Sequence, residues 1–330
     1  MGKIGVLGAG TWGTALAIML AQNAHSVTLW SAIDNELSTL RETHTHPNLK
    51  DSVIPESIIF TNNISEVCSD KDVLLFAVAS PYVRETATKA SPYIKEGQII
   101  VDAAKGLEDN TLFTMSQVIK DSIEKDVTVV ALSGPTHAEE VALGLPTTVV
   151  AACRNPDAAA QVQNIFMNTC MRVYTNEDIL GVELCGALKN IIALACGISA
   201  GLGFGDNARA AIITRGIAEM SRLGMAMNCD KMTFAGLAGL GDLIVTATSR
   251  HSRNNKAGFL IGSGYSADEA IRKVGMVVEG VHAIPSALKL AEKYKVDMPI
   301  ITAVHKTISG ELAPDEAVNF LMNRKKKSEK

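Results

Sequence analysis

The chain has 330 residues, of which 47% are hydrophobic and 20% are charged, and its formal net charge is -4. A chain of this length can bury a large core, and we expect two domains. The charge argues against nucleic acid as a partner, and the six cysteines form neither a CxxC pair nor a histidine-containing cluster. We therefore expect reduced thiols and no bound metal.

The first predicted strand, residues 3–7, runs straight into a glycine-rich turn and a helical pattern. Gly8, Gly10 and Gly13 have the GxGxxG spacing, and a second strand at 26–30 returns at the distance of a βαβ unit. Gly8 allows a tight turn, Gly10 lets the backbone approach a pyrophosphate, and Gly13 lets the helix pack against the strand. The helix N-terminus then faces the anion. This context predicts a dinucleotide site, and a purely structural glycine turn is the alternative.

Strand-like runs alternate with helical patterns up to about residue 176. Several are continuous apolar runs rich in branched residues, which is typical of strands buried on both faces of a parallel sheet. These runs lie at residues 58–60, 73–78, 99–102, 127–132, 147–151 and 171–174. Helical patterns lie between most of them, for example at 111–124 and 157–168. The alternation predicts an α/β fold with a doubly wound Rossmann-type sheet.

Beyond about residue 177 the pattern changes. Long helical patterns occupy residues 182–201, 208–223 and 283–294, and no branched strand run lies among them. We therefore expect a dinucleotide-binding Rossmann domain at 1–180 and an all-helical substrate-binding domain at 181–330.

We expect a cytoplasmic protein without stable membrane insertion. Strand residues begin at Lys3, which leaves no room for a signal peptide. The longest apolar run, around residues 191–202, is too short to span a bilayer. The basic segment from Arg324 to Lys327 is typical of a solvated terminus.

Ligands of open α/β sheets bind beyond the carboxyl ends of the strands. The predicted strand at 73–78 ends in small residues, the one at 99–102 is followed by Lys105, and the one at 127–132 by Gly134, Thr136 and His137. Lys105 fits an ammonium group at the site and a surface lysine in a turn equally well. His137 is more typical of a residue near a helix cap.

Two isolated charges lie in apolar segments of the helical domain. Lys189 interrupts an almost wholly apolar helix at 184–194, and Asp242 lies in the glycine-rich segment 235–244. Lysine is rarely buried without a partner. Lys189 either snorkels to the surface or lies in a closed cleft that suits it for acid–base chemistry. Asp242 either pairs with a cation, for which Lys189 is a candidate, or caps a helix after Gly241.

A cluster of cations and hydrogen-bond donors follows at residues 249–256. Such clusters are usually solvated surface. A guanidinium at Arg253 between Ser252 and Asn254, at a predicted helix start, is also the chemistry that captures phosphate.

Together, these motifs resemble the bacterial-type NAD(P)-dependent glycerol-3-phosphate dehydrogenase family over essentially the whole chain. Residues 8–17 (GAGTWGTALA) are similar to the family's GAGSWGTALA, and residues 102–106 (DAAKG) to its S-x-x-K-G segment. Further matches are SGPTHAEEV at 133–141, ALKNIIA at 187–193, AGLGDL at 238–243, SRN at 252–254 and MVVEGV at 276–281. Several distant motifs in the right order make chance agreement negligible.

The resemblance implies reduction of dihydroxyacetone phosphate to sn-glycerol 3-phosphate with NAD or NADP, for phospholipid synthesis, by a homodimer. It implies that Lys189 donates and accepts the proton. The implied substrate-binding residues are Lys105, Gly134, Thr136, Lys189, Asp242, Ser252, Arg253 and Asn254. With the turn glycines, the cofactor-binding positions are Gly8, Gly10, Thr11, Trp12, Gly13, Ala32, Lys105, Ala138, Arg253, Val277 and Glu279.

The chain departs from the family pattern at three of these positions. Thr11 and Thr136 replace the usual serines and keep a hydroxyl. Ala32 stands where the family often has an arginine or histidine that could receive a 2′-phosphate, and the nearest acid, Asp34, lies past the strand end. The preference between NADH and NADPH therefore stays open.

Two other functions are alternatives to this one. A related two-domain 3-hydroxyacid or hydroxyacyl-CoA dehydrogenase lacks the combination of ALKN, AGLGDL and SRN. A non-catalytic dinucleotide sensor would not need Lys189.

Overall fold

The computed structural model describes residues 1–249, 251–326 and 328–329 and consists of two compact units. The first unit comprises Met1–Glu108 and Phe113–Glu183, and the second comprises Asp109–Leu112 and Leu184–Lys330. The sequence-based division after residue 180 falls a few residues before the chain enters the second unit for good. The short excursion at Asp109–Leu112 has no signal in the hydrophobic pattern.

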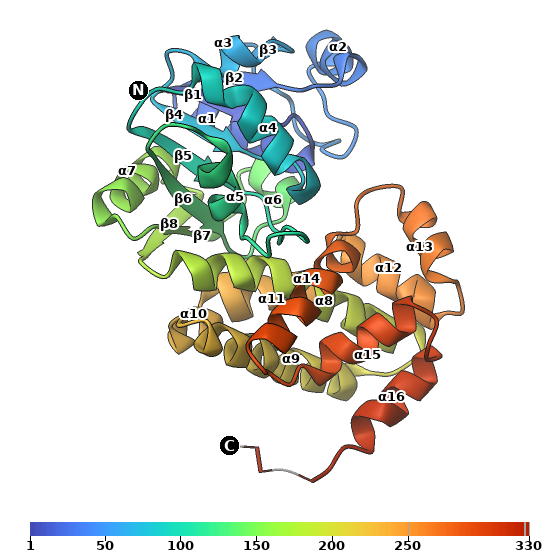
Figure 1. Ribbon diagram of the computed structural model, residues 1–330. Coiled ribbons are helices and arrows are strands. Elements are labelled where there is room, and N and C mark those ends of the chain that lie inside the picture. Colours follow the sequence, from blue (N-terminus) through green and yellow to red (C-terminus); the bar gives the residue numbers. More distant parts are fainter. Residues whose placement is uncertain (250, 327, 330) are drawn as a thin grey trace. The chain divides into compact units, whose positions relative to one another are not determined.

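The first unit is built on one eight-stranded sheet with the order β3-β2-β1-β4-β5-β6-β7-β8 (Figure 1). Its strands are β1 (Lys3–Leu7), β2 (Ser26–Trp30), β3 (Ile59–Thr61), β4 (Val73–Phe76), β5 (Gln98–Asp102), β6 (Val127–Ser133), β7 (Thr147–Ala152) and β8 (Met171–Asn176). Every strand expected from the sequence is present, which confirms the Rossmann-type α/β fold.

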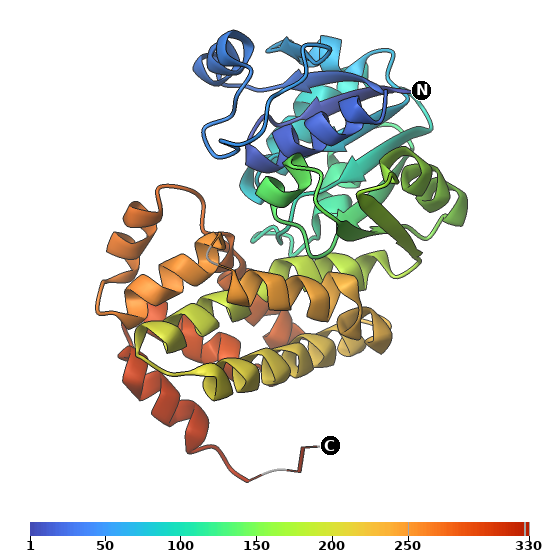
Figure 2. The same cartoon turned by 180° about the vertical axis from the view of Figure 1, so that it is seen from behind.

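Helices cover both faces of this sheet. They are α1 (Thr11–Gln22), α2 (Asp34–Thr43), α3 (Ile64–Cys68), α4 (Val83–Ala90), α5 (Met115–Ser122), α6 (Ala138–Ala142) and α7 (Pro156–Phe166), with the 3-10 turns η1 (Ser80–Tyr82) and η2 (Ser91–Tyr93). Val73 and Leu75 of β4 pack into one apolar cluster, whereas Leu74 and Phe76 pack into another. Because successive strand side chains point to opposite faces, the sheet is buried on both. α4 lies in front of it in Figure 1 and α1 in Figure 2.

One strand pairing differs from the expected parallel sheet. β7 pairs with β6 in the antiparallel sense, and β8 is parallel to β7. An apolar run that is buried on both faces has the same pattern in either direction, so the sequence carries no signal for this reversal.

The regular elements of the second unit are all helices among its described residues, as expected. Its helices are α8 (Ile179–Gly201, which starts in the first unit), α9 (Asp206–Ala226), α10 (Lys231–Ala235), α11 (Asp242–Thr248), α12 (Arg253–Gly262), α13 (Ala267–Val274), α14 (Glu279–Lys293), α15 (Pro299–Ile308) and α16 (Pro314–Met322). A π-helical turn, η3 (Leu237–Gly241), leads into α11.

α8 is the core helix of the second unit. It is long and apolar enough to cross a membrane, but 89% of its most apolar stretch is buried inside the protein. Glycines bring it against α12: a Cβ on Gly197 would lie 2.1 Å from the carbonyl oxygen of Asn255, and one on Gly258 2.1 Å from that of Leu194. This close packing fixes the start of α12 relative to the middle of α8.

Candidate active site

The glycine turn between β1 and α1 has the geometry that the sequence predicts. Gly8 has a φ of +119°, and a Cβ on Gly13 would lie 1.9 Å from the carbonyl oxygen of Gly8. A Cβ on Gly10 would meet nothing within 4 Å, so the chain has open space at the start of α1. The N-terminus of a helix in this setting suits an anionic group such as a pyrophosphate. The residues present therefore fit a dinucleotide.

Two neighbours of the turn differ in their surroundings. Trp12 is half-buried and packs against the core of the first unit. Thr11 begins α1, and its Oγ1 accepts a hydrogen bond of 3.0 Å from Nδ2 of Asn48, in the loop after α2. The glycine motif carries no signal for Asn48, because that contact comes from a distant segment.

The end of β2 offers no cation at the position next to the expected adenosine ribose. Ser31 is buried and its hydroxyl donates to Glu36 over 2.5 Å, while Ala32 is exposed. The carboxylate of Asp34 accepts a 2.8 Å hydrogen bond from Asn62. The two nearest acids are thus engaged by side chains of the protein itself.

The carboxyl ends of β5 and β6 bring three of the predicted residues together. Nζ of Lys105 lies 3.4 Å from the carbonyl oxygen of Gly134, and the hydroxyl of Thr136 donates to the same oxygen over 3.2 Å. Gly134 has a φ of +151°, and a Cβ there would lie 2.9 Å from the carbonyl oxygen of Thr148. Ala138 follows as the first residue of α6, and His137 stands at the N-cap position.

In the second unit, Lys189 forms a buried ion pair. Its Nζ lies 2.5 Å from Oδ1 of Asp242 and donates to Oγ1 of Thr246 over 2.6 Å. Lys189 is 5% exposed and Asp242 is fully buried. The snorkelling alternative is therefore wrong, and the pairing of the two charges is correct. Thr246 is not among the residues predicted from the sequence. Its position four residues after Asp242 places it on the same face of the helix, and this spacing could have indicated it.

The segment before Asp242 explains its run of glycines. The turn η3 closes with an N–H of Gly241 that donates to the carbonyl of Gly236 over 3.1 Å, and a Cβ on Gly239 would lie 2.2 Å from the carbonyl oxygen of Phe234. π-Helical turns often occur at functional sites. Here the turn delivers Asp242 to the side of Lys189 as the first residue of α11 rather than as its cap.

A second polar network joins α8, α12 and α14. Nδ2 of Asn254 donates to Oδ1 of Asn190 over 2.9 Å, and the N–H of Gly280 donates to Oδ1 of Asn254 over 2.9 Å. Nδ2 of Asn190 reaches Oε2 of Glu279 at 3.4 Å. These hydrogen bonds hold the side chain of Asn254 in place. Asn190 directly follows Lys189 on α8, so the network is attached to the helix that carries the ammonium group.

The start of α12 presents an exposed guanidinium. Ser252 is buried as the N-cap, and its hydroxyl accepts from the N–H of Asn255 over 3.2 Å. Arg253 is exposed at the first helical position, and Val277 is half-buried before α14. Arg250 of the cationic cluster and Lys327 of the basic tail lie outside the described residues.

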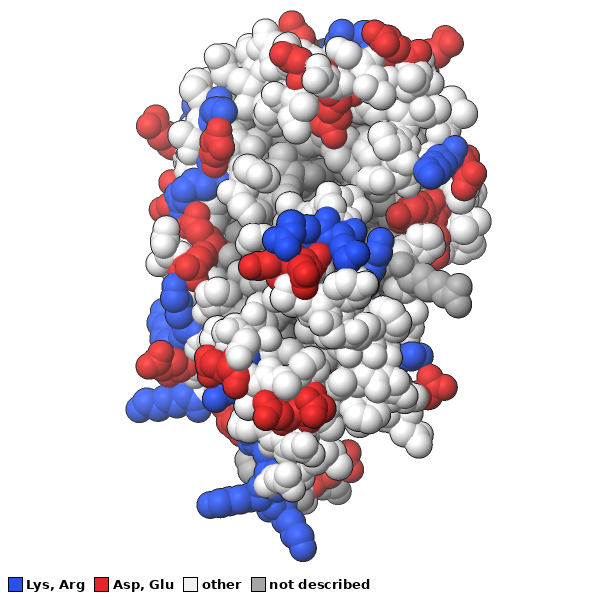
Figure 3. Space-filling view, turned by 90° about the vertical axis from the view of Figure 1, so that its right-hand side faces the viewer, with Lys and Arg blue, Asp and Glu red and all other residues white. Residues whose placement is uncertain are grey.

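On the face shown in Figure 3, basic and acidic side chains lie next to each other, so the charges of this face are mixed in sign. All six cysteines are free thiols, and the described residues contain no group of three or more potential metal ligands.

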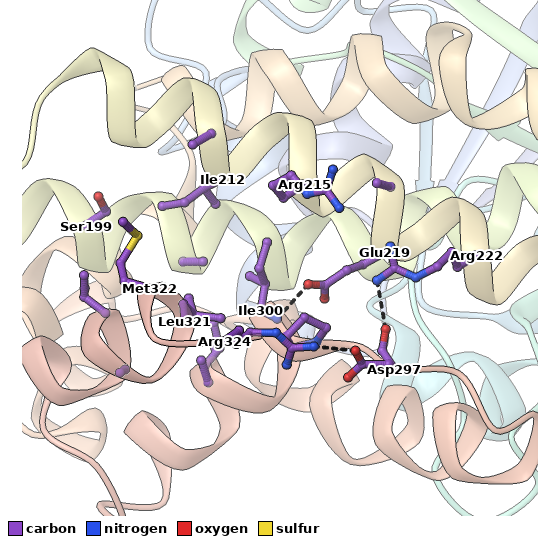
Figure 4. A pocket seen from close by; sticks show the side chains of 18 of the residues that line it. Ser199, Ile212, Arg215, Glu219, Arg222, Asp297, Ile300, Leu321, Met322 and Arg324 are labelled. Carbon is purple, nitrogen blue, oxygen red and sulfur yellow. Dashed lines mark hydrogen bonds and ion pairs between the residues drawn. The ribbon is translucent and has the colours of Figure 1, made fainter. Parts of the chain in front are cut away.

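The second unit also has a groove of about 1080 Å³ between α9, α15 and α16 (Figure 4). Glu219 points into it, is 2% exposed and accepts from the N–H groups of Ile300 and Ile301 over 2.8 and 3.4 Å. Burial raises the pKa of Glu219 to about 7.

At the rim of this groove, Arg222 and Arg324 both donate hydrogen bonds to Asp297. Among the residues that line this groove there is none of those predicted for the active site.

Comparison with known proteins covers both units. Residues 3–159 match the model of the NAD-dependent glycerol-3-phosphate dehydrogenase N-terminus, and residues 178–319 that of its C-terminus. A glycerol-3-phosphate dehydrogenase (NAD(P)+) 2 of Lactobacillus delbrueckii is 58% identical, and the match covers 100% of this chain and 99% of that protein. A glycerol-3-phosphate dehydrogenase (NAD(P)+) of Agathobacter rectalis is 52% identical, and the match covers 100% of this chain and 98% of that protein. The crystal structure of a glycerol-3-phosphate dehydrogenase from Coxiella burnetii has a TM-score of 0.93 and 36% identity, covering 98% of this chain and 99% of that one.

Proposed function

Because the chain belongs to the NAD-dependent glycerol-3-phosphate dehydrogenase family, it interconverts dihydroxyacetone phosphate and glycerol 3-phosphate with NAD or NADP, and we propose that Lys189 transfers the proton. The observation that carries this role is a buried ammonium group bonded to one carboxylate and one hydroxyl. A group that acts as a general acid must be held in place and in the right protonation state.

The reaction needs a hydride at the ketone carbon and a proton at the ketone oxygen. A nicotinamide cofactor bound at the glycine turn would supply the hydride. Lys189 polarises the carbonyl with its ammonium group and then gives up a proton to the oxygen, which carries the electron pair of the broken C=O π bond. Asp242 and Thr246 orient the ammonium group, and in the reverse direction the neutral amine takes the proton back.

We assign the substrate-binding residues to each unit separately. In the first unit, Lys105, Gly134 and Thr136 are supported by their convergence at the ends of β5 and β6. In the second unit we assign Asp242, Ser252, Arg253 and Asn254. The exposed guanidinium of Arg253 at the N-terminus of α12 suits a phosphate dianion, which it can bind through two parallel N–H groups.

The proposed cofactor site is based on the glycine turn. Thr11 and Trp12 follow it directly, and the lack of a cation at Ala32 favours neither NADH nor NADPH strongly. The remaining proposed cofactor residues are Gly8, Gly10, Gly13, Lys105, Ala138, Arg253, Val277 and Glu279.

We further propose that the enzyme is cytoplasmic, serves phospholipid synthesis and forms a homodimer. The groove between α9 and α16 supports a dimer, because Ile212, Leu321 and the largely exposed Met322 give it an apolar wall. Light scattering on the full chain measures the mass. A dimer that becomes monomeric in Leu321→Lys supports this interface, and a monomeric wild type contradicts it.

Steady-state kinetics test the activity itself. Dihydroxyacetone phosphate is offered with NADH and NADPH in parallel, and a 3-oxoacid and a 3-oxoacyl-CoA serve as comparison substrates. Turnover confined to dihydroxyacetone phosphate is expected. Turnover of a comparison substrate would favour the related dehydrogenases, and NADH binding without any turnover would favour a sensor.

A further inference from the structure

The loop that carries Lys105 begins at a buried carboxyl group. Asp102 is the last residue of β5 and is 1% exposed. Its Oδ1 accepts a hydrogen bond of 3.0 Å from the N–H of Ala104, the turn by which an Asp side chain shapes the backbone two residues on. Its Oδ2 is buried without a hydrogen-bond partner among the described residues.

The same loop ends at a second buried carboxyl group. Leu107 and Thr114 form an antiparallel bridge, and the hydroxyl of Thr114 donates to Oε2 of Glu183 over 2.8 Å. The N–H and hydroxyl of Ser116 donate to Oε1 and Oε2 of Glu183, each over 2.7 Å. Glu183, on α8 and 7% exposed, therefore receives three hydrogen bonds at the N-terminus of α5, where a negative charge is favoured.

Between these ends the loop has little freedom to shift. A Cβ on Gly106 would lie 2.4 Å from Cβ of Ser80 and 2.5 Å from its Oγ. The backbone beside Lys105 thus lies close against the first residue of η1, the turn that follows β4. Its conformation depends on the two ends that hold it there.

The two carboxyl groups differ in how well the protein supports a negative charge. Burial raises the pKa of both, and the charge of Glu183 raises the pKa of Asp102 further. At Glu183 the hydrogen bonds from Ser116 and Thr114 and the charge of Lys120 oppose the rise in pKa, whereas at Asp102 only the N–H of Ala104 does so. Two like charges buried together are costly, so one group holds a proton. Asp102 is the group with fewer donors.

We propose that Asp102 and Glu183 are positioning residues for Lys105: Asp102, as a neutral acid, holds the start of its loop, and Glu183, as a carboxylate, holds the end. This inference rests on the proposed function of Lys105. It adds two residues that touch neither substrate nor cofactor and that act on the reaction through the backbone between them.

A double-mutant cycle on the full-length enzyme tests the positioning role. Asp102→Ala removes the acceptor for Ala104, and we expect kcat/KM for dihydroxyacetone phosphate to fall at least tenfold, as it should in Lys105→Met. If Asp102 acts through Lys105, adding Asp102→Ala to Lys105→Met lowers kcat/KM less than twofold further, because residues in one network are not additive.

Two results of the cycle overturn the proposal in different ways. A full tenfold further loss in the double variant would mean that Asp102 supports the fold in general. Wild-type kcat/KM in Lys105→Met would instead mean that the proposed function of Lys105 is wrong, and the positioning role would fail with it.

Asp102→Asn tests the neutral acid and does not depend on Asp102→Ala being folded. Asparagine keeps the acceptor for Ala104 without a charge, so we expect kcat/KM at pH 7 within about threefold of the wild type. A raised pKa in the native state means that the native protein binds more protons than the unfolded chain. Its stability therefore falls as the pH rises above the ordinary range of a carboxyl group.

The melting temperature, measured from pH 5 to 9, shows whether Asp102 holds this proton. We expect the wild-type Tm to fall with rising pH, and Asp102→Asn to reduce that fall. Glu124→Gln, which removes an exposed carboxylate from the same unit, should keep the wild-type slope. An unchanged slope in Asp102→Asn, or a loss of activity as large as in Asp102→Ala, would contradict a neutral Asp102.

Discussion

Each of the two units buries a pair of ionisable groups, and the pairs are opposite in kind. In the helical unit, Lys189 and Asp242 have opposite charges and lie 2.5 Å apart. In the sheet unit, Asp102 and Glu183 would carry like charges, and burial raises the pKa of both. A buried carboxylate that is paired with a cation keeps its charge, whereas two carboxyl groups that are buried together without a cation cannot both be charged cheaply, so one of them holds a proton. In the roles proposed above, the helical unit therefore holds an ammonium group for proton transfer, and the sheet unit holds a neutral acid that shapes a loop.

Removing the cation from the helical pair is expected to have the largest effect. Lys189→Met keeps the apolar stem and removes the general acid, so kcat should fall by about 10²–10⁴-fold. It also leaves Asp242 buried without its cation, which should lower the free energy of unfolding by about 3–5 kcal/mol. Stopped assays measure kcat, and urea unfolding measures the stability.

The companion variant Lys189→Met with Asp242→Asn separates the two consequences. Without the buried charge, most of the stability should return while kcat stays low. Near-normal turnover in this folded double variant would show that the ion pair is structural and that the proton comes from elsewhere.

The exposed cation of the same unit, Arg253, should have the next largest effect. Its binding energy orients the ketone, so Arg253→Ala should lose about 2–4 kcal/mol in kcat/KM on dihydroxyacetone phosphate. Activity on unphosphorylated dihydroxyacetone, which has nothing for Arg253 to hold, should barely change. Lys256→Ala, which removes another exposed cation from α12, is the matched control. Equal losses on both substrates would assign Arg253 to the cofactor or the fold.

Much of this arrangement could be predicted from the sequence, because it follows from local patterns. The glycine spacing before α1 predicts the turn, and the isolation of Lys189 and Asp242 in apolar segments makes their pairing one of two alternatives, of which the structure selects the ion pair. The sequence pattern does not show Asn48 beside Thr11, because the contact joins distant segments. It also gives no sign that Glu183 supports Thr114, since a glutamate on a helix is ordinary until tertiary packing buries it.

The cofactor preference is expected to be a smaller effect, and it concerns a place where the sheet unit lacks a cation. With Ala32 at the end of β2, NADH and NADPH should both support turnover, with kcat/KM values within roughly a hundredfold of each other, since an arginine–phosphate contact contributes only a few kcal/mol. Ala32→Arg should shift the ratio toward NADPH by about tenfold. Parallel kinetics with both cofactors measure it. A larger wild-type ratio would reveal a contact elsewhere in the site.

Glu219 tests whether a buried carboxyl group with no ion pair among the described residues takes up a proton in the helical unit as well, although the charge of Arg222 partly opposes the rise in its pKa. It lies in the helical unit, like Asp242, but its side chain accepts only backbone N–H groups, and burial raises its pKa from 4.5 to about 7. Between those two pH values the native protein binds more protons than the unfolded chain, so stability falls as the pH rises, by about 3 kcal/mol at most. Glu219→Gln removes this dependence and should be more stable than the wild type at pH 8 by about 1–3 kcal/mol, with little difference at pH 5.

The kcat of Glu219→Gln should be unchanged, because Glu219 lies in the groove of Figure 4, apart from the proposed reacting groups. Urea unfolding at the two pH values measures the difference. If the stabilities of the wild type and the variant instead depend equally on pH, Glu219 keeps its charge without an ion pair. The difference between the two buried pairs would then not predict the protonation of a third buried group.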